Sequence, residues 1–467
     1  MQQRDVSEYI NAAKDSLTNF KRESMKYNFM LQQLRSNEHE KVTIWLQALT
    51  QCTTYIQPMH TDLLFTLYNL QLSPSQQFLE LYYNLLLHMI TANTAFVNGV
   101  IHSIFTRIIP ENNQLFSFFL SVCQKIITLV PLSIQFFISN FQKCMPNKWK
   151  TVQQFTTYVE FFRTSFDMIP QIGEQCLISC IELMISYDTD IQKNSDMFEI
   201  DEMDSVTKLN ELLTYILSWI GNIPQHLEKT LLKTFDNLIV KTQFISYTPI
   251  IYLFYCSNEE RCNTFVSFLL SQISQSNKNV NSAELYTCHL GGFVSNSAIL
   301  PASMTNEILE KIGQIFSAEK NMTVKILLCQ QVFTIINSKI VELETRTDIT
   351  GLFGSNGVVA KMIVDKCNPF GNCSQRTVKQ FINICKSRQL MDPQQLLAEN
   401  ALLVEPLFVS CPLVSYDPYH IPEFWKDQTN HLVIQKTPLE LYDEDEEDNN
   451  NQIQAMSLEN NSWDFTL

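Results

Sequence analysis

The chain has 467 residues, 45% of them hydrophobic, and only ten are glycine, about 2% where about 7% is usual. Glycine is needed wherever the backbone takes a positive φ or approaches a phosphate, so this scarcity argues against turn-rich sheets and nucleotide-binding folds. The net charge is -15, and residues 438–467 hold nine acidic residues and no Lys or Arg, which leaves -6 for the rest and no basic excess for holding nucleic acid directly.

The 13 cysteines are scattered, and none of their spacings recurs as a paired zinc pattern. Most of them lie among apolar residues, so we expect buried, reduced thiols in an intracellular protein. The first residues lack the apolar core of a signal peptide, and the apolar runs are broken well before 18 residues. We therefore expect neither a signal peptide nor a membrane-spanning helix.

Apolar residues recur at helical spacing almost throughout the chain. One run has apolar residues at positions 78, 81, 82, 85, 86 and 89, and a second has them at 116, 119, 120, 123, 127 and 130. Three helix pairs share an aliphatic-Pro hinge, at Pro131, Pro170 and Pro224. The first two hinges are 39 residues apart. The second and third are also about 40 residues apart if about 15 residues of an acidic interruption between them are left out. A spacing of about 40 residues is the length of a HEAT repeat.

These patterns predict an all-α, HEAT-type helical-repeat solenoid with a disordered acidic C-terminal tail. Each amphipathic pair needs neighbours to bury its apolar face, and the stacked array presents a long surface that suits protein partners. The expected parts are an N-terminal helical extension (1–40), N-terminal HEAT repeats (41–187), an acidic loop (188–205), C-terminal HEAT repeats (206–435) and the disordered acidic tail (436–467).

No pattern of catalytic, cofactor-binding or metal-binding residues is found. The glycines at 351, 354 and 357 have neither a preceding strand nor a following Lys-Ser/Thr, so a loop between helices is favoured over a phosphate loop. Gly291-Gly292 indicates close packing of helices. The eight histidines show no metal-ligand spacing, and no serine lies in a nucleophile-elbow sequence. We expect a protein that is not an enzyme and that has no cofactor.

Basic residues and proline-directed phosphorylation motifs supply the remaining candidates. Arg376, Lys379 and Lys386 recur at helical spacing, which is typical of a solvated helix face and also suits contact with an acidic partner or with DNA held by one. Ser73 and Thr437 each precede a proline, as proline-directed kinases require, although Ser73 also suits a helix N-cap. A phosphate on Thr437, beside the acidic tail, would add to a repulsive field.

Several segments, in order along the chain, resemble the RNA polymerase I-specific transcription initiation factor family (TIF-IA). These are VTIWLQALTQCTTYI (42–56), the helical pair at 77–110, IITLVPLSIQFFI (126–138), the acidic loop and following helix (197–220), and the segments 247–273, 284–312, 324–336, 367–384 and 415–425. Of the family's Phe-Pro-Phe-Asp-Pro motif only Asp417-Pro418 is clear, and the acidic loop and tail are short.

The resemblance implies a nuclear and nucleolar protein that binds RNA polymerase I through its stalk subunits and joins it to promoter-bound core factor at ribosomal RNA genes. It also implies a serine-containing, phosphorylation-controlled patch in the N-terminal half. Ser133, at the Val-Pro turn, is a candidate phosphosite and could instead cap a helix. The patch candidates are Ser103, Ser117, Ser121, Ser133 and Ser139.

Other partners and another class of protein remain open from the sequence. The free protein could form a homodimer, and neither membrane contact nor direct sequence-specific nucleic-acid binding is expected. The alternative function is a HEAT-repeat nuclear transport receptor or scaffold adaptor, which would explain the repeats and the acidity but not the ordered set of family segments. Binding to the Ran GTPase would distinguish the two.

Overall fold

The computed structural model describes residues 3–21, 24–36, 38–166, 168–194, 201–242, 245–275, 280–346, 349–354, 356–399, 409 and 411–419. The chain divides into two compact units, unit 1 (residues 1–183) and unit 2 (residues 184–467). Helices and short helical turns make up both units, and no β-strand forms among the residues described. The predicted all-α helical-repeat fold is therefore confirmed, whereas the predicted tail (436–467) lies outside the described residues.

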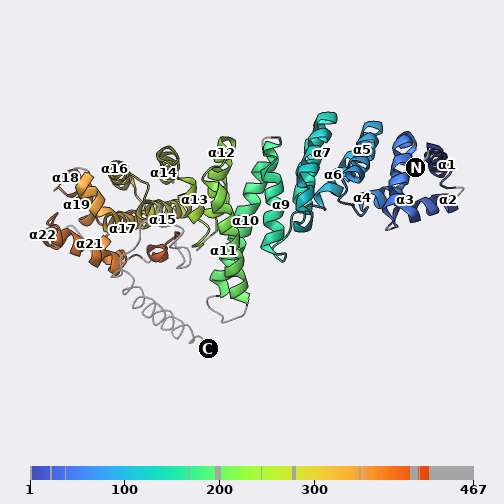
Figure 1. The fold of residues 1–467 in the computed structure, drawn as a ribbon. Helices are drawn as coiled ribbons and strands as arrows, with labels where there is room; N and C mark the ends of the chain where they lie inside the picture. The colour runs from blue at the N-terminus through green and yellow to red at the C-terminus, as the bar shows by residue number, and fades with distance from the viewer. Residues whose placement is uncertain are drawn as a thin grey trace, which may run out of the picture. The chain divides into compact units, whose positions relative to one another are not determined.

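Unit 1 is a row of helices that follow one another in chain order (Figure 1). The helices are α1 (Gln3–Thr18), α2 (Ser24–Leu34), α3 (His39–Gln51), α4 (Thr61–Tyr68), α5 (Gln76–Ala92), α6 (Val97–Phe105), α7 (Phe116–Leu129), α8 (Ile134–Cys144) and α9 (Val152–Arg163). Short 3-10 turns join some of them, at η1 (Thr53–Tyr55), η2 (Thr94–Phe96), η3 (Pro110–Leu115) and η4 (Pro131–Ser133). Helix α10 (Pro170–Asn194) begins in unit 1 and ends in unit 2.

Aromatic side chains fill the space between the later helices of unit 1. The Phe162 ring on α9 lies 4.7 Å from the Phe105 ring on α6 and 4.9 Å from the Phe141 ring on α8, both edge to face. Tyr158, also on α9, is fully buried and donates its hydroxyl hydrogen to the Phe141 carbonyl oxygen at 2.9 Å. The rings thus bury a large apolar area in a geometry favoured by their quadrupoles, and the one polar atom is satisfied.

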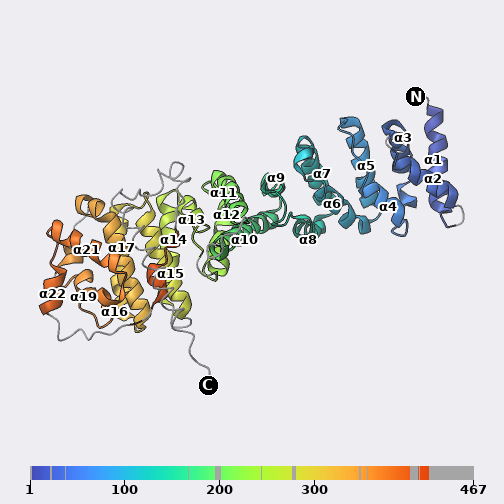
Figure 2. The ribbon, with the colours of Figure 1, turned by 90° about the horizontal axis from the view of Figure 1, so that it is seen from below.

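Unit 2 contains the remaining helices. They are α11 (Asp201–Ile220), α12 (Gln225–Thr234), α13 (Ile250–Tyr255), α14 (Glu259–Ser274), α15 (Val280–Asn296), α16 (Ala302–Ala318), α17 (Met322–Arg346), α18 (Thr350–Phe353), α19 (Val358–Ile363), α20 (Pro369–Asn372), α21 (Gln375–Ser387) and α22 (Pro393–Glu399). A π-helical turn, η5 (Phe235–Ile239), follows α12, and a 3-10 turn, η7 (Pro412–Ser415), comes last. Figure 2 shows α15 lying among the helices of this unit.

Helices α15 and α17 pack closely because α15 carries glycine where they meet. A Cβ at Gly291 would lie 2.0 Å from the Gln331 side chain on α17, and a Cβ at Gly292 would lie 2.9 Å from the Tyr419 ring. The predicted close packing at this glycine pair is confirmed.

The segment 322–345 of α17 is long and apolar enough to cross a membrane. However, 72% of its most apolar 18-residue stretch is buried inside the protein, as in the core helix of a folded domain.

The proline hinges lie where the sequence places them. Helix α7 ends at Leu129, just before Pro131, α10 begins at Pro170, and Pro224 directly precedes α12.

All 13 cysteines are free thiols; eleven are buried, and Cys144 and Cys411 are half-buried. The expectation of reduced, mostly buried cysteines agrees with this arrangement.

The predicted acidic loop at 188–205 is wrong over most of its length. Helix α10 continues to Asn194 and α11 begins at Asp201, so only residues 195–200, which are not described, separate the two helices. Asp188 is fully buried, and its carboxylate accepts hydrogen bonds from the backbone N–H groups of Ser246, Tyr247 and Thr248 at 3.3, 3.0 and 2.8 Å. The Thr248 hydroxyl also donates to this carboxylate, at 2.8 Å. An acidic residue is buried here because four donors replace water.

Replacing Asp188 by Ala should destabilise unit 2 by about 3 kcal/mol, because three backbone N–H groups lose their acceptor in a buried site. Urea unfolding followed by circular dichroism measures this loss. The matched control is Asp204→Asn, since the Asp204 side chain is 65% exposed in its i,i+4 ion pair with Lys208 and its replacement should change stability by no more than about 0.5 kcal/mol. Equal stability of the two variants would show that Asp188 does not hold the 246–248 segment.

His289, on α15, predicts a pH dependence. Its ring is buried between Phe235 and Tyr419, its Nδ1 has no hydrogen-bond partner, and burial lowers its pKa to about 3. The unfolded chain takes up this proton near pH 6.5 and the folded chain does not, so stability is present above that pH and is lost as pH falls. From pH 7 to pH 5 the expected loss from this group is about 2 kcal/mol.

The variant His289→Phe should remove that part of the pH dependence, because phenylalanine takes up no proton. It should still fold, because Nδ1 has no hydrogen bond to lose. Urea unfolding at pH 7 and pH 5 compares it with His226→Phe, which alters an exposed histidine. A pH dependence that is unchanged in the His289 variant would contradict the assignment.

Candidate docking surfaces

Exposed large apolar side chains are concentrated in unit 1. Of those in the described part of the chain, only Val341 lies in unit 2. The others are Met25, Phe29, Tyr55, Met59, Phe65, Ile109, Leu129, Leu132, Phe136 and Trp149. Contiguous exposed apolar residues mark interaction sites, so among the residues described it is unit 1 that offers candidate docking surfaces.

The first surface lies around the turn between α7 and α8, and we call it the turn surface. It consists of a hollow of about 480 Å³ between α5 and α7 and of the apolar residues that follow the hollow along the chain. The hollow is lined by Leu87, Ser121, Gln124, Lys125, Thr128 and Leu129, and the apolar residues that follow are Leu132 and Phe136. Leu132 is 81% exposed and Leu129 50% exposed.

The exposed leucines result from the way α7 ends. The helix buries Phe119, Val122 and Ile126 at spacings of three and four, and Leu129 continues that stripe. At Pro131 the chain turns into η4, so the last part of the stripe has no helix to pack against. Because the stripe is interrupted by tertiary structure at the turn, the helical periodicity of the sequence does not identify Leu129 as an exposed residue.

The charge of this region is unlike that of the whole chain. Between Glu111 and Glu160 there is no Asp or Glu, whereas there are four lysines, at 125, 143, 148 and 150. The turn surface contains Lys125 and the hydroxyl groups of Ser121 and Thr128. It is therefore an apolar, hydroxyl-bearing and weakly basic surface on a protein of net charge -15.

The structure divides the five predicted patch serines. Ser117 is exposed and Ser121 half-buried, and they lie four residues apart on one face of α7. Ser139 is half-buried on α8. Ser103 is buried on α6 and donates its hydroxyl hydrogen to the Val100 carbonyl oxygen at 2.8 Å, so it cannot belong to a surface patch.

The predicted surface position of Ser133 is wrong, whereas Ser133 does occupy the N-cap position of α8, although without a side-chain cap bond. Its side chain is fully buried in η4 and its hydroxyl has no hydrogen-bond partner, so it is neither an accessible phosphosite nor a side-chain cap of α8. The turn is tight enough that the Ser133 backbone N–H donates to the Val130 carbonyl oxygen at 2.8 Å, and this points the side chain inward.

The two Ser/Thr-Pro candidates and the basic helix have separate locations. Ser73 is half-buried and precedes α5 by three residues; the cap position is Ser75, so the N-cap reading of Ser73 is wrong by two residues. Thr437 lies outside the described residues. Helix α21 in unit 2 carries Lys379 and Lys386, which are exposed, and Arg376, which is half-buried. The structure does not bring these candidates to one site.

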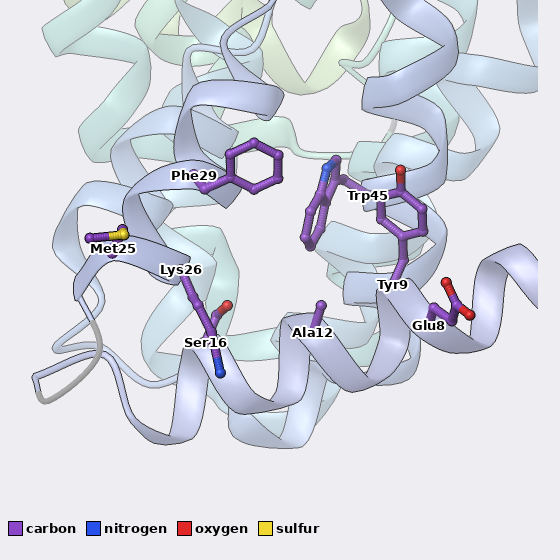
Figure 3. Close-up of a pocket in the computed structure, with 8 residues that line it drawn as sticks. All are labelled: Glu8, Tyr9, Ala12, Ser16, Met25, Lys26, Phe29 and Trp45. Atoms are coloured by element: carbon purple, nitrogen blue, oxygen red, sulfur yellow. The ribbon is translucent and has the colours of Figure 1, made fainter.

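A second hollow, of about 540 Å³, lies between α1, α2 and α3 (Figure 3). The rings of Tyr9 and Trp45 meet edge to face with centroids 5.0 Å apart, and Phe29 lies across from them. Met25 and Phe29 on α2 are 84% and 55% exposed. At the rim, Lys26 forms an ion pair with Asp15 at 2.6 Å. This hollow could not be predicted from the sequence, because its lining residues follow the ordinary helical spacing of α1, α2 and α3.

No cluster of three or more potential metal ligands occurs among the described residues. Cys144 and His102 form a close thiol–imidazole pair, with the sulfur and Nδ1 3.4 Å apart, and burial raises the pKa of the Cys144 thiol to about 11. That thiol is therefore protonated at neutral pH and is not an activated nucleophile. What the geometry of these surfaces supports is docking.

Comparisons with known proteins agree with this view. The family model for the RNA polymerase I specific transcription initiation factor RRN3 matches residues 1–216, just under half of the chain. A crystal structure of RNA polymerase I transcription initiation factor Rrn3 matches 92% of this chain and 98% of its own, with a TM-score of 0.77 and 15% identity. No curated protein matches by sequence. The resemblance seen in the sequence is confirmed over residues 1–216, and the fold is shared over nearly the whole chain.

A negative charge introduced at position 133 should destabilise the fold of unit 1, because the side chain at this position is buried. We expect Ser133→Glu to lower stability by about 3 kcal/mol or more, because an unpaired carboxylate would be buried, and Ser133→Ala to be neutral, because no hydrogen bond is lost. Ser117→Glu, at an exposed position, should fold normally. Thermal unfolding of the three variants measures this, and a stable Ser133→Glu protein would contradict the buried placement.

Proposed function

We propose that this chain, whose first 216 residues match the RNA polymerase I-specific initiation factor family, binds RNA polymerase I and brings it to the promoters of ribosomal RNA genes. In this proposal the polymerase stalk subunits are bound by unit 1, and promoter-bound core factor is the second partner. The protein acts in the nucleus and nucleolus and works by binding, without catalysing a reaction.

The turn surface is the observation on which the polymerase contact rests. It combines an exposed leucine pair, Leu129 and Leu132, with a hollow and with a region that has no acidic residue between positions 111 and 160. Apolar side chains that are exposed on an ordered turn gain free energy when a partner covers them, at about 25 cal/mol per Å² of apolar area. Few side chains lose freedom in that step, because α5 and α7 already hold the surface in shape.

Phosphorylation would act on this surface through Ser117 and Ser121. A phosphate adds about two negative charges at neutral pH and brings water to the apolar patch beside it. Contact with the polymerase would then weaken by desolvation cost and by changed charge. Ser117 and Ser121 replace Ser133 in this proposal, because Ser117 is exposed and Ser121 half-buried, whereas Ser133 is fully buried.

Unit 2 is assigned the second partner. Lys379 and Lys386 face solvent on α21, and they give this helix a basic side that core factor, or DNA held by it, could contact. Two exposed lysines on an acidic chain are too few to hold a specific DNA site alone, which typically takes several phosphate contacts. The free protein forms a homodimer only if one of the exposed apolar surfaces of unit 1 is self-complementary.

The competing function is that of a HEAT-repeat nuclear transport receptor or scaffold adaptor. A receptor of that kind would bind the Ran GTPase, whereas an initiation factor would not. The family match over residues 1–216 favours the initiation factor.

A negative charge introduced among the exposed leucines of the turn surface should weaken polymerase binding. We expect Leu132→Glu and Leu129→Glu to weaken binding of the full-length chain to purified RNA polymerase I at least about tenfold, the loss of 1.4 kcal/mol or more that follows when a buried apolar contact becomes charged. Biolayer interferometry with the purified polymerase measures the effect. Val341→Glu, at the one exposed large apolar residue described in unit 2, is the matched control.

Binding of Ran with no binding of RNA polymerase I would replace this function by the transport receptor. Normal polymerase binding by both leucine variants would keep the function and move the contact elsewhere. Circular dichroism spectra should be unchanged in all three variants, because the replaced side chains are exposed.

A further inference from the structure

The turn between α8 and α9, residues 145–151, exposes a tryptophan among lysines and lies outside the turn surface. Trp149 is 80% exposed, the only one of the three described tryptophans that is not buried. Lys148 and Lys150 flank it, and Lys143 lies in the last turn of α8. The Lys148 Nζ atom lies 5.1 Å from the centre of the Trp149 ring, within the range of a cation–π contact.

Hydrogen bonds fix the backbone that carries Trp149. The Asn147 side-chain oxygen accepts the Trp149 backbone N–H at 3.2 Å, and the Asn147 carbonyl oxygen accepts the Lys150 backbone N–H at 3.0 Å. The Thr151 hydroxyl then caps α9 by accepting the Gln154 N–H at 3.3 Å. The indole is therefore presented on an ordered turn, so a partner that covers it would immobilise little additional chain.

The lysines have no acidic neighbours along the chain. The nearest acidic residues in sequence are Glu111 and Glu160, and Glu160 already pairs with Arg163 at 2.7 Å. Within the described part of the protein, Lys143 and Lys150 form no ion pair with a carboxylate. A local positive potential with an aromatic side chain at its centre is the complement of an anionic partner with an apolar group.

We propose that the α8–α9 turn binds an acidic segment of a partner protein. Carboxylates of that segment pair with the exposed Lys143 and Lys150, and one of its apolar side chains packs against the exposed indole of Trp149. This site is separate from the turn surface, so the proposal does not depend on the polymerase contact assigned there.

A protein segment fits this site better than nucleic acid does. Tight non-specific binding to nucleic acid takes about 6–10 phosphate contacts, whereas the turn and the last turn of α8 together have three lysines, on a chain of net charge -15. Base stacking would also need the ring face over which Lys148 lies. Two or three carboxylates and one apolar side chain, by contrast, match the number of groups that the turn presents.

The test uses full-length protein and three fluorescein-labelled probes in fluorescence anisotropy. The first is a 12-residue peptide with six Asp or Glu residues, one Phe and one Leu. The second replaces each acidic residue by its amide, and the third is a 20-nucleotide oligo-dT. We expect the acidic peptide to bind, the amide peptide to bind at least about tenfold more weakly, and rising salt to weaken binding of the acidic peptide.

Variants localise the binding. Lys143→Glu combined with Lys150→Glu should weaken binding of the acidic peptide about tenfold, and Trp149→Ala about fivefold. The matched control is Lys21→Glu, an exposed lysine in unit 1 whose Nζ lies 5.8 Å from the Phe20 ring, and it should change binding less than about twofold.

Any of three results would overturn the proposal. These are no binding of the acidic peptide at 1 mM or equal binding of the amide peptide, tighter binding of the oligonucleotide, or unchanged binding in the variants of the α8–α9 turn. Polymerase binding by these same variants is a separate readout, so failure of this site and failure of the proposed function are distinguishable.

Discussion

The packing of each helix pair against the next is the constraint on which the rest of the structure depends. A single pair cannot bury its apolar face, so aromatic rings such as Phe105, Phe141 and Phe162 are shared between helices, with centroids under 5 Å apart for the Phe162 contacts. The inner faces of the helices are buried by this packing and cannot contact a partner. What remains for partners are the outer helix faces and the turns, where Leu132 and Trp149 are 81% and 80% exposed.

The two units put polar and apolar groups to different uses. Unit 2 buries Asp188 against four hydrogen-bond donors and buries His289 among aromatic rings. Its helices α15 and α17 come close together at Gly291. The interior of unit 2 therefore depends on particular polar and small side chains at particular positions. Unit 1 instead leaves apolar residues exposed at the turns between its helices. This difference is why we assign the polymerase contact to unit 1.

Helical period and proline position predicted most of the architecture, because both act locally. The stripe from Phe78 to Met89 is almost wholly buried in α5, and the hinges at Pro131, Pro170 and Pro224 separate helices as expected. Predictions failed where tertiary contacts decide the outcome. Asp188 reads as part of an exposed acidic loop, and only the donors at 246–248, about 60 residues later, explain its burial.

The candidate site shows the same limit. Ser133 is a reasonable surface hydroxyl in sequence, yet it is fully buried in the tight turn after Val130, whereas Ser117 on α7 is exposed and Ser121 half-buried. Leu129 continues the buried stripe of α7 and is exposed where α7 ends.

Hydrogen–deuterium exchange of the full-length chain, with and without purified RNA polymerase I, tests the central claim most directly. The account predicts protection in residues 116–136 on binding; protection confined to unit 2 would contradict it.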